Sequence, residues 1–230
     1  MAAPYANVET AAIATERSFL REVFAWMLLA LAVTTGIAIW FHASGGVLNY
    51  FNDHQGIFFA CLGAQLAVVF GLSLAINRIS AQVATLLFLL YAALTGLTFS
   101  ILLEVYTTGS IVGAFAGATG VFGGMAVYGY TTERDLSSWG AILFGALIGL
   151  IVASIAFLFV GGSTFNLILG FAGVIIFAGL TSYDMQKLKQ LNAQAMSEEH
   201  HQKAAIFGAL MLYLDFINIF LSLLRIFGRD

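Results

Sequence analysis

Long apolar stretches, each separated from the next by a few polar residues, dominate the pattern of hydrophobic and polar positions along this chain. A helix needs roughly 20 apolar residues to cross the approximately 30 Å of hydrocarbon in a bilayer. Seven stretches reach that length, at residues 23–43, 57–76, 81–103, 110–130, 140–160, 164–183 and 204–227. The pattern therefore predicts an all-α, polytopic membrane protein with seven transmembrane helices. It assigns residues 1–22 to a cytoplasmic N-terminal segment and residues 23–230 to the transmembrane domain.

The composition agrees with a membrane protein and excludes an ordinary soluble domain. Of the 230 residues, 60% are hydrophobic and only 9% are charged, and the mean hydropathy is +0.94. About a quarter of the residues of a soluble domain are normally charged. No basic patch suggests nucleic acid as a partner. The single cysteine, Cys61, excludes a disulfide within the chain and a metal site built on two cysteines.

The distribution of basic residues predicts the orientation, because loops on the cytoplasmic side carry an excess of Lys and Arg. Seven basic residues fall on the side of the N-terminus and two on the other side. The seven are Arg17, Arg21, Arg78, Arg134, Lys187, Lys189 and Lys203, and the two are Arg225 and Arg229. We therefore expect a cytoplasmic N-terminus and a C-terminus outside. Six helices and a re-entrant last segment would instead bring the C-terminal arginines inside.

Asp215 is the clearest candidate for a functional residue, because it lies near the middle of the last apolar stretch. An ionised side chain at that depth costs roughly 2.5–3.5 kcal/mol on insertion scales, so a residue kept there is a functional candidate. Asp215 shares one helix face with five other residues, most of them small or polar, that recur at intervals of three and four. They are Gly208, Met211, Asn218, Ser222 and Arg225. Tyr213, Asn218 and Ser222 are the supporting polar residues around the acid.

A second acid, Asp184, follows the sixth apolar stretch, and Arg78 follows the second. Adjacent spans are antiparallel, so Asp184 and Asp215 are predicted to meet near the cytoplasmic half, with Arg78 as counter-ion. Depth is the difficulty, because Asp215 lies about 16 Å inside the last stretch at 1.5 Å per residue. The pair requires that the sixth helix continue past Asp184 or that the seventh begin late. The alternatives are an interfacial charge for Asp184 and a topology signal for Arg78.

Two further sites with charged residues could have a functional role, but each also has a simple structural interpretation. Glu104 ends the third stretch and is either interfacial or part of a pore mouth. Residues 198–201, Glu-Glu-His-His, lie in the link between the sixth and seventh stretches. They could bind a metal, but adjacent histidines do not share a helix face, and a solvated link is the favoured interpretation.

Several motifs resemble the Bax-inhibitor (transmembrane BAX inhibitor motif) family, and in particular its bacterial members. The C-terminal motif is Leu-Tyr-Leu-Asp-Phe-Ile-Asn-Ile-Phe at 212–220, followed by Leu-Leu-Arg at 223–225. Supporting motifs are Tyr-Ala-Ala-Leu-Thr-Gly-Leu-Thr at 91–98, Gly-Tyr-Thr-Thr-Glu-Arg-Asp-Leu at 129–136 and Tyr-Asp at 183–184. The resemblance covers nearly the whole chain past its first twenty residues. It implies a location in the bacterial cytoplasmic membrane.

The resemblance also implies a fold and an activity. It implies seven helices with the last one central, and a pH-sensitive calcium leak. The family's proposed sensor, two aspartates on the last two helices latched by an arginine of helix two, matches Asp184, Asp215 and Arg78. Those aspartates would be the ligands of the transported calcium, and no cofactor is implied. Some relatives carry a glutamate within helix two, whereas the second stretch here has Gln65 and Ala67 and no acid, which predicts weaker ion affinity.

The sequence leaves two functions open and disfavours others. The first is a passive cation leak gated by the aspartate pair, which would titrate as one unit. The second is a non-conducting regulator of protein quality control that binds the membrane-anchored AAA protease, a partner that the resemblance implies. An intramembrane aspartyl protease is disfavoured because Leu-Tyr-Leu, without glycine, precedes Asp215. A retinal receptor fails because the last stretch has no lysine. We therefore expect no enzyme.

Overall fold

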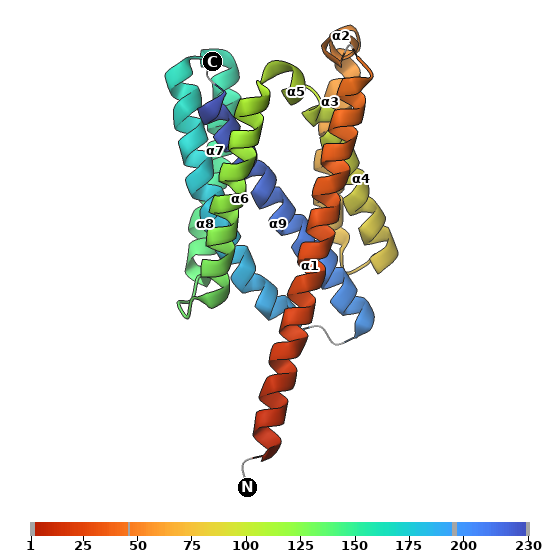
Figure 1. Cartoon of the computed structure of the whole chain (residues 1–230), viewed down its shortest axis with the longest axis vertical. Helices are drawn as coiled ribbons and strands as arrows, with labels where there is room; N and C mark the ends of the chain where they lie inside the picture. Colours follow the sequence, from red (N-terminus) through yellow and green to blue (C-terminus); the bar gives the residue numbers. More distant parts are fainter. Residues whose placement is uncertain (1–2, 46, 195–196, 229–230) are drawn as a thin grey trace. The chain divides into compact units, whose positions relative to one another are not determined.

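A computed structural model of the chain describes residues 3–45, 47–194 and 197–228 (Figure 1). These residues form α-helices joined by short links. The helices are α1 (Ala3–Ala43), α2 (Val47–Asp53), α3 (Gln55–Ala75), α4 (Ala81–Phe99), α5 (Leu102–Val105), α6 (Thr108–Thr131), α7 (Ser137–Val160), α8 (Ser163–Gln194) and α9 (Glu198–Phe227). Ser80 and Thr107 begin α4 and α6, and each hydroxyl accepts a hydrogen bond from a backbone N–H three residues later.

The seven predicted spans are confirmed. Seven stretches are helical and apolar enough to cross a membrane, at Glu16–Ala43, Gly56–Ala75, Ala81–Val105, Thr108–Thr131, Ser137–Val160, Ser163–Asn192 and Glu198–Phe227. The prediction was wrong about the link between the last two, which it extended from Asp184 to Lys203. Instead α8 continues through Gln194, and α9 begins at Glu198. Hydropathy follows contact with lipid, whereas the backbone hydrogen bonds of a helix continue through polar residues.

The helices differ in how much of their surface is buried. In α9, 67% of the residues in the most apolar window are buried, against at most 39% in any other span. Strong burial of the last span agrees with the expectation of a central last helix. In α7 no residue of that window is buried, so most of its apolar surface is left exposed to lipid, although one side contacts α8. Gly161 and Gly162, which link α7 to α8, both have positive φ, a conformation that favours glycine.

The chain divides into two compact units, and α8 and α9 contribute to both. The first contains residues 1–101 and 188–210, and the second contains residues 102–187 and 211–230. In the first unit α1 packs along α4, where a side chain at Gly96 would place its Cβ 2.7 Å from the Thr34 carbonyl oxygen. The Thr34 hydroxyl donates to the Ala92 carbonyl at 2.9 Å. On the other side of α4, the Gln65 amide of α3 donates to the Thr98 hydroxyl at 3.3 Å.

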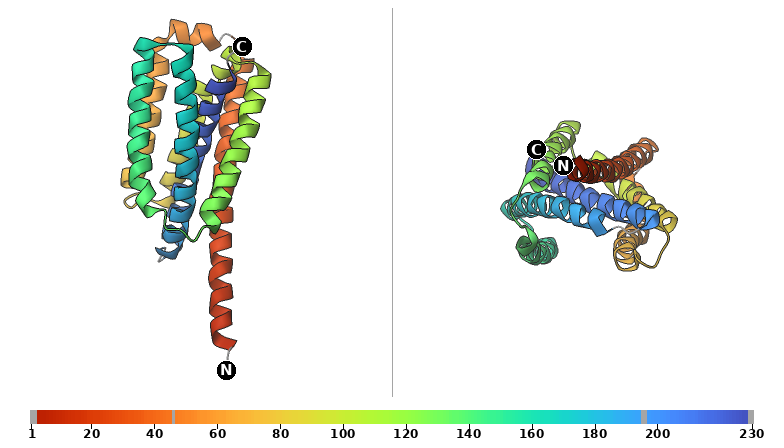
Figure 2. Two further views of the ribbon diagram at one scale, coloured as in Figure 1. Left: turned by 90° about the vertical axis from the view of Figure 1, so that its left-hand side faces the viewer. Right: turned by 90° about the horizontal axis from the view of Figure 1, so that it is seen from below.

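In the second unit α8 lies beside α6 and α7, as the views of Figure 2 show. A side chain at Gly129 of α6 would place its Cβ 2.7 Å from the Cα of Ser182 on α8. The Ser182 hydroxyl donates to the Met125 carbonyl at 2.8 Å. On the α7 side, a Cβ at Gly140 would lie 2.7 Å from the Tyr183 ring. Small residues thus bring the backbones close, as they commonly do between membrane helices.

The structure leaves the orientation in the membrane as a prediction. The division into segments 1–22 and 23–230 also stays a prediction, and α1 passes through its boundary without a break. Arg229, one of the two basic residues counted on the far side, lies outside the described residues.

Candidate functional site: a buried carboxyl pair

The site is built where α8 packs closely against α9 within the second unit. A Cβ at Gly170 would lie 2.8 Å from the Ile226 side chain and 3.0 Å from the Ser222 carbonyl oxygen. A Cβ at Gly173 would collide with the Ser222 side chain. The two glycines therefore let α9 approach α8 so closely that the backbone of one helix nearly touches the other. This contact determines which residues of the two antiparallel segments face each other.

The register of that contact brings Thr181 opposite Asp215. Thr181 lies eight residues after Gly173, or about 12 Å along α8 at 1.5 Å per residue. Asp215 lies seven residues before Ser222, or about 10 Å along α9 in the same direction. The two residues therefore lie at nearly the same level of the two helices, and both side chains are buried. Thr181 is fully buried, and its hydroxyl donates to the Phe177 carbonyl of its own helix at 2.8 Å.

Asp215 is the most enclosed acid in the described part of the chain. Its exposed fraction is 4%. One of its carboxyl oxygens, Oδ2, is buried and has no hydrogen-bond partner among the described residues. A buried polar atom without a partner loses its hydration and receives nothing in return, which costs about 1–3 kcal/mol. Such an atom in a native fold calls for an explanation, such as a proton, a bound ion or water, or a catalytic role.

Asp184 completes the pair. It lies three residues after Thr181, so both side chains share one face of α8. Asp184 is half-buried, and its carboxyl group interacts electrostatically with that of Asp215. Lys187, three residues further along α8, is the positive charge that acts on Asp184. The second unit contains both acids, while the prediction that Asp184 and Asp215 act together as a pair stays a prediction.

The depth difficulty disappears because α8 is longer than its apolar run. Asp184 is eight residues, or about 12 Å, before Asn192 at the end of the span. It is therefore inside the helix and not at its end.

The other predicted residues surround the pair in part. Tyr213 is fully buried and Ser222 is 7% exposed. The Asn218 amide donates to the Leu214 carbonyl of its own helix at 2.7 Å, so its donor is used locally. Arg78 is exposed in the turn between α3 and α4 and belongs to the first unit. Its predicted role as the counter-ion of the pair stays a prediction.

The sequence reasoning missed a clamp on α8 just beyond the pair. The Gln186 side chain accepts a hydrogen bond from the Leu136 N–H at 2.8 Å. It also donates to the Arg134 carbonyl at 2.8 Å. Both ends of the amide thus bind the link between α6 and α7, in which Ser137 donates to the Asp135 carboxylate. These hydrogen bonds lower the pKa of Asp135. The clamp holds the loop against α8 two residues after Asp184.

Comparison with known proteins identifies the family. The family model described as inhibitor of apoptosis-promoting Bax1 matches residues 16–230. The chain belongs to the Bax inhibitor family. It is 44% identical over 215 residues to the inner membrane protein YbhL of Escherichia coli strain K12, covering 93% of this chain and 92% of that protein. It is 45% identical over 210 residues to an uncharacterized protein of Deinococcus radiodurans, covering 91% and 90%.

A third relative, an uncharacterized protein of Borreliella burgdorferi, is 39% identical over 218 residues and matches 94% of each chain. Membership confirms the resemblance drawn from the C-terminal motif around Asp215. Together with the seven spans, it establishes an integral membrane protein related to a bacterial inner membrane protein.

Proposed function

We propose that this protein is a passive, pH-gated leak for cations, with calcium as the transported ion and Asp184 and Asp215 as the gate. The observation that supports the proposal is the unpartnered oxygen of Asp215, buried in the most enclosed span beside a second carboxyl group. Neither a purely structural hydrogen bond nor an interfacial charge explains such an oxygen. A carboxyl group that binds a proton in one state and a cation in the other would account for this oxygen.

The protonation of the pair provides the gate. When the pair holds a proton, one carboxyl group donates a hydrogen bond to the other, and the shared proton takes the place that a cation would occupy. When both groups are ionised, the negative charges repel each other. Two carboxylates then present the oxygen ligands that Ca²⁺ prefers. Low pH therefore closes the leak, and rising pH opens it.

The surroundings of the pair suit weak binding and release. Ca²⁺ takes six to eight oxygen ligands in tight sites. Within the second unit the pair offers two carboxylates and the hydroxyl of Thr181. So few oxygen ligands would bind Ca²⁺ weakly, which favours rapid release of the ion over tight binding. In this proposal Arg78 latches Asp184 in the closed state, while Lys187 limits the negative charge when the pair is ionised.

Reconstitution into liposomes that contain a calcium-sensitive dye tests the proposal. We expect calcium influx that increases with pH, and an altered influx with a flattened pH dependence in Asp215→Asn, which keeps the shape of the side chain and removes its charge. Asp135→Asn is the matched control, because it makes the same chemical change at an exposed loop position, where the Asn oxygen can still accept the hydrogen bond from the Ser137 N–H. Its flux should equal that of the wild type.

The outcome separates the leak from the regulator. A folded Asp215→Asn variant with wild-type flux at every pH would contradict the gate. A wild-type protein that reconstitutes but passes no calcium would contradict conduction altogether. In that case, co-purification of a membrane-anchored AAA protease would favour the regulator of protein quality control. We propose no enzymatic activity.

A further inference from the structure

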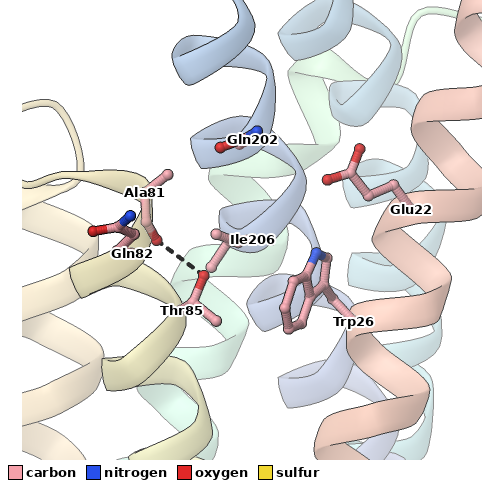
Figure 3. A pocket seen from close by; sticks show the side chains of 7 residues that line it. All are labelled: Glu22, Trp26, Ala81, Gln82, Thr85, Gln202 and Ile206. Carbon is pink, nitrogen blue, oxygen red and sulfur yellow. Dashed lines mark hydrogen bonds between the residues drawn. The ribbon is translucent and has the colours of Figure 1, made fainter.

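A pocket opens within the first unit, apart from the carboxyl pair (Figure 3). Its volume is about 250 Å³. One wall is α1, with Glu22 and Trp26, and the opposite wall is the start of α4, with Gln82 and Thr85. The first turns of α9 contribute Gln202 and the buried, apolar Ile206. The pocket thus combines one carboxylate, one indole, two carboxamides and one hydroxyl around an apolar surface.

Glu22 provides the only formal charge of the lining. Its carboxylate faces His201, whose Nδ1 lies 3.6 Å from Oε2. That distance is too long for a hydrogen bond, so the carboxylate keeps its acceptor capacity. The Thr85 hydroxyl donates its hydrogen to the Ala81 carbonyl at 2.9 Å. It therefore faces the pocket as an acceptor.

These groups select the class of ligand. An anion is disfavoured, because the lining has one negative charge and no lysine or arginine. A tightly held divalent metal is disfavoured too, since no three His, Cys, Asp or Glu residues come together within the described part of the chain. An alkylammonium group fits: its N–H groups bind the Glu22 carboxylate and the amide oxygens, and its carbon atoms pack on Ile206. The Trp26 ring attracts the positive charge of such a group.

Size and place agree with this ligand. Pockets for drug-sized molecules hold roughly 300–1,000 Å³, so this slightly smaller one suits a group of a few heavy atoms. The lining residues lie in the first turns of the spans of α4 and α9 and within the first three turns of the span of α1. Span ends border the lipid head groups, where tryptophan is common. An ammonium group reaches such a site either from a lipid head group or from the aqueous phase.

We propose that the pocket between α1, α4 and the start of α9 binds a primary alkylammonium group, with Glu22 as its counter-ion and Trp26 as its aromatic wall. This site does not depend on ion conduction by the carboxyl pair. It would make the contact of α1 with α4 and α9 sensitive to amines at the membrane surface.

Tryptophan fluorescence tests the site directly. The chain has three tryptophans, so the double variant Trp40→Phe, Trp139→Phe leaves Trp26 as the only reporter. The probe is ethanolamine, added to protein in a maltoside detergent and an amine-free alkaline buffer, because a protonated His201 would compete for Glu22. We expect a saturable change in Trp26 emission that an equal concentration of sodium chloride does not produce.

Charge variants in the same background decide whether Glu22 holds the ligand. Glu22→Gln should weaken ethanolamine binding at least about tenfold, because it removes a charge-assisted hydrogen bond. Glu199→Gln is the matched control: Glu199 is an exposed acid of the first turn of α9, is paired with Lys203 and lies outside the pocket. It should bind as the parent does. If Glu22→Gln does not fold, Gln202→Leu replaces it, with several-fold weaker binding expected.

Nanodiscs identify the source of the amine. The shifted Trp26 emission in phosphatidylethanolamine discs, without further response to added ethanolamine, would assign the site to the lipid. A response to ethanolamine in both phosphatidylethanolamine and pure phosphatidylglycerol discs would assign it to a soluble amine. The proposal is overturned by an unsaturable response in detergent, or by equal affinities for Glu22→Gln and Glu199→Gln.

Discussion

Replacing Thr181 by valine should shift the pH at which the proposed leak opens, because in the proposed gate this buried hydroxyl turns from the Phe177 carbonyl to donate to the ionised Asp215 carboxylate. Valine keeps the branched shape and removes only the hydroxyl. A hydrogen bond to a charged group is worth about 1.5–3 kcal/mol, and a neutral one about 0.5–1.5 kcal/mol. The ionised form of Asp215 thus loses about 1 kcal/mol more than the neutral form does.

The sign and size of the shift follow from that difference. One pH unit corresponds to about 1.4 kcal/mol, so the midpoint should move by about 0.7 unit. Because the ionised, open form is the one that loses more, a higher pH is needed to reach it. The midpoint of calcium flux therefore rises. The assay is dye-reported influx into liposomes across a series of pH values, with the midpoint fitted for each variant.

Two control variants separate this effect from a general loss of packing. Thr181→Ser keeps the hydroxyl and should restore the wild-type midpoint. Thr119→Val removes an exposed hydroxyl of α6 that also donates to a carbonyl four residues back, at 2.9 Å. It should leave the midpoint unchanged. A Thr181→Val protein that folds and has the wild-type midpoint would refute the idea that this hydroxyl responds to the charge of Asp215.

Three further results are expected. Arg78→Ala should shift the midpoint of flux, and the shift should vanish in an Asp184→Asn background; additive shifts would leave Arg78 as a topology signal. Gly129→Ala should lower the thermal stability in detergent by about 1–3 kcal/mol, since the new methyl group meets the backbone of Ser182. Gly124→Ala, on the same helix with open space around it, should not. A reporter fused to the C-terminus should report a location outside the cytoplasm, and strong cytoplasmic activity in a folded fusion would overturn the proposed orientation.

The spans were predictable from the sequence because lipid imposes a long apolar run on any helix that crosses it. The ends were not, and α8 shows why. Its apolar run stops at Tyr183, but the helix continues through Gln194. The residues that follow are mostly polar and include the charged Asp184 and Lys187, but they are all compatible with a helix. A pattern of hydropathy therefore underestimated α8 and created an apparent mismatch in depth between the two aspartates, which the longer helix removes.

The carboxyl pair was predictable in its charged members only. Asp215 stands out because an acid is rare in an apolar run, and Asp184 follows from antiparallel packing. Thr181 and Gln186 are uncharged, so nothing in the local pattern marks them. Thr181, three residues before Asp184, becomes a signal only once the face of α8 that meets α9 is known, and Gln186 only once the side that meets the α6–α7 link is known. That face depends on Gly170 and Gly173, and thus on tertiary contacts.

The same tertiary contacts bear on how the proposed gate responds to charge. Near the pair, α8 is held to α6 by the hydrogen bond from Ser182 to the Met125 carbonyl. Two turns before Thr181, it meets α9 at Gly173 without room for a methyl group. Two carboxylates on helices held in this way cannot relieve their repulsion by moving apart, because separation would break those contacts. The remaining relief is a counter-charge between them. Because glycine packing keeps Asp184 and Asp215 close together, their ionisation favours the binding of a cation between them. A leak that opens with rising pH requires this coupling.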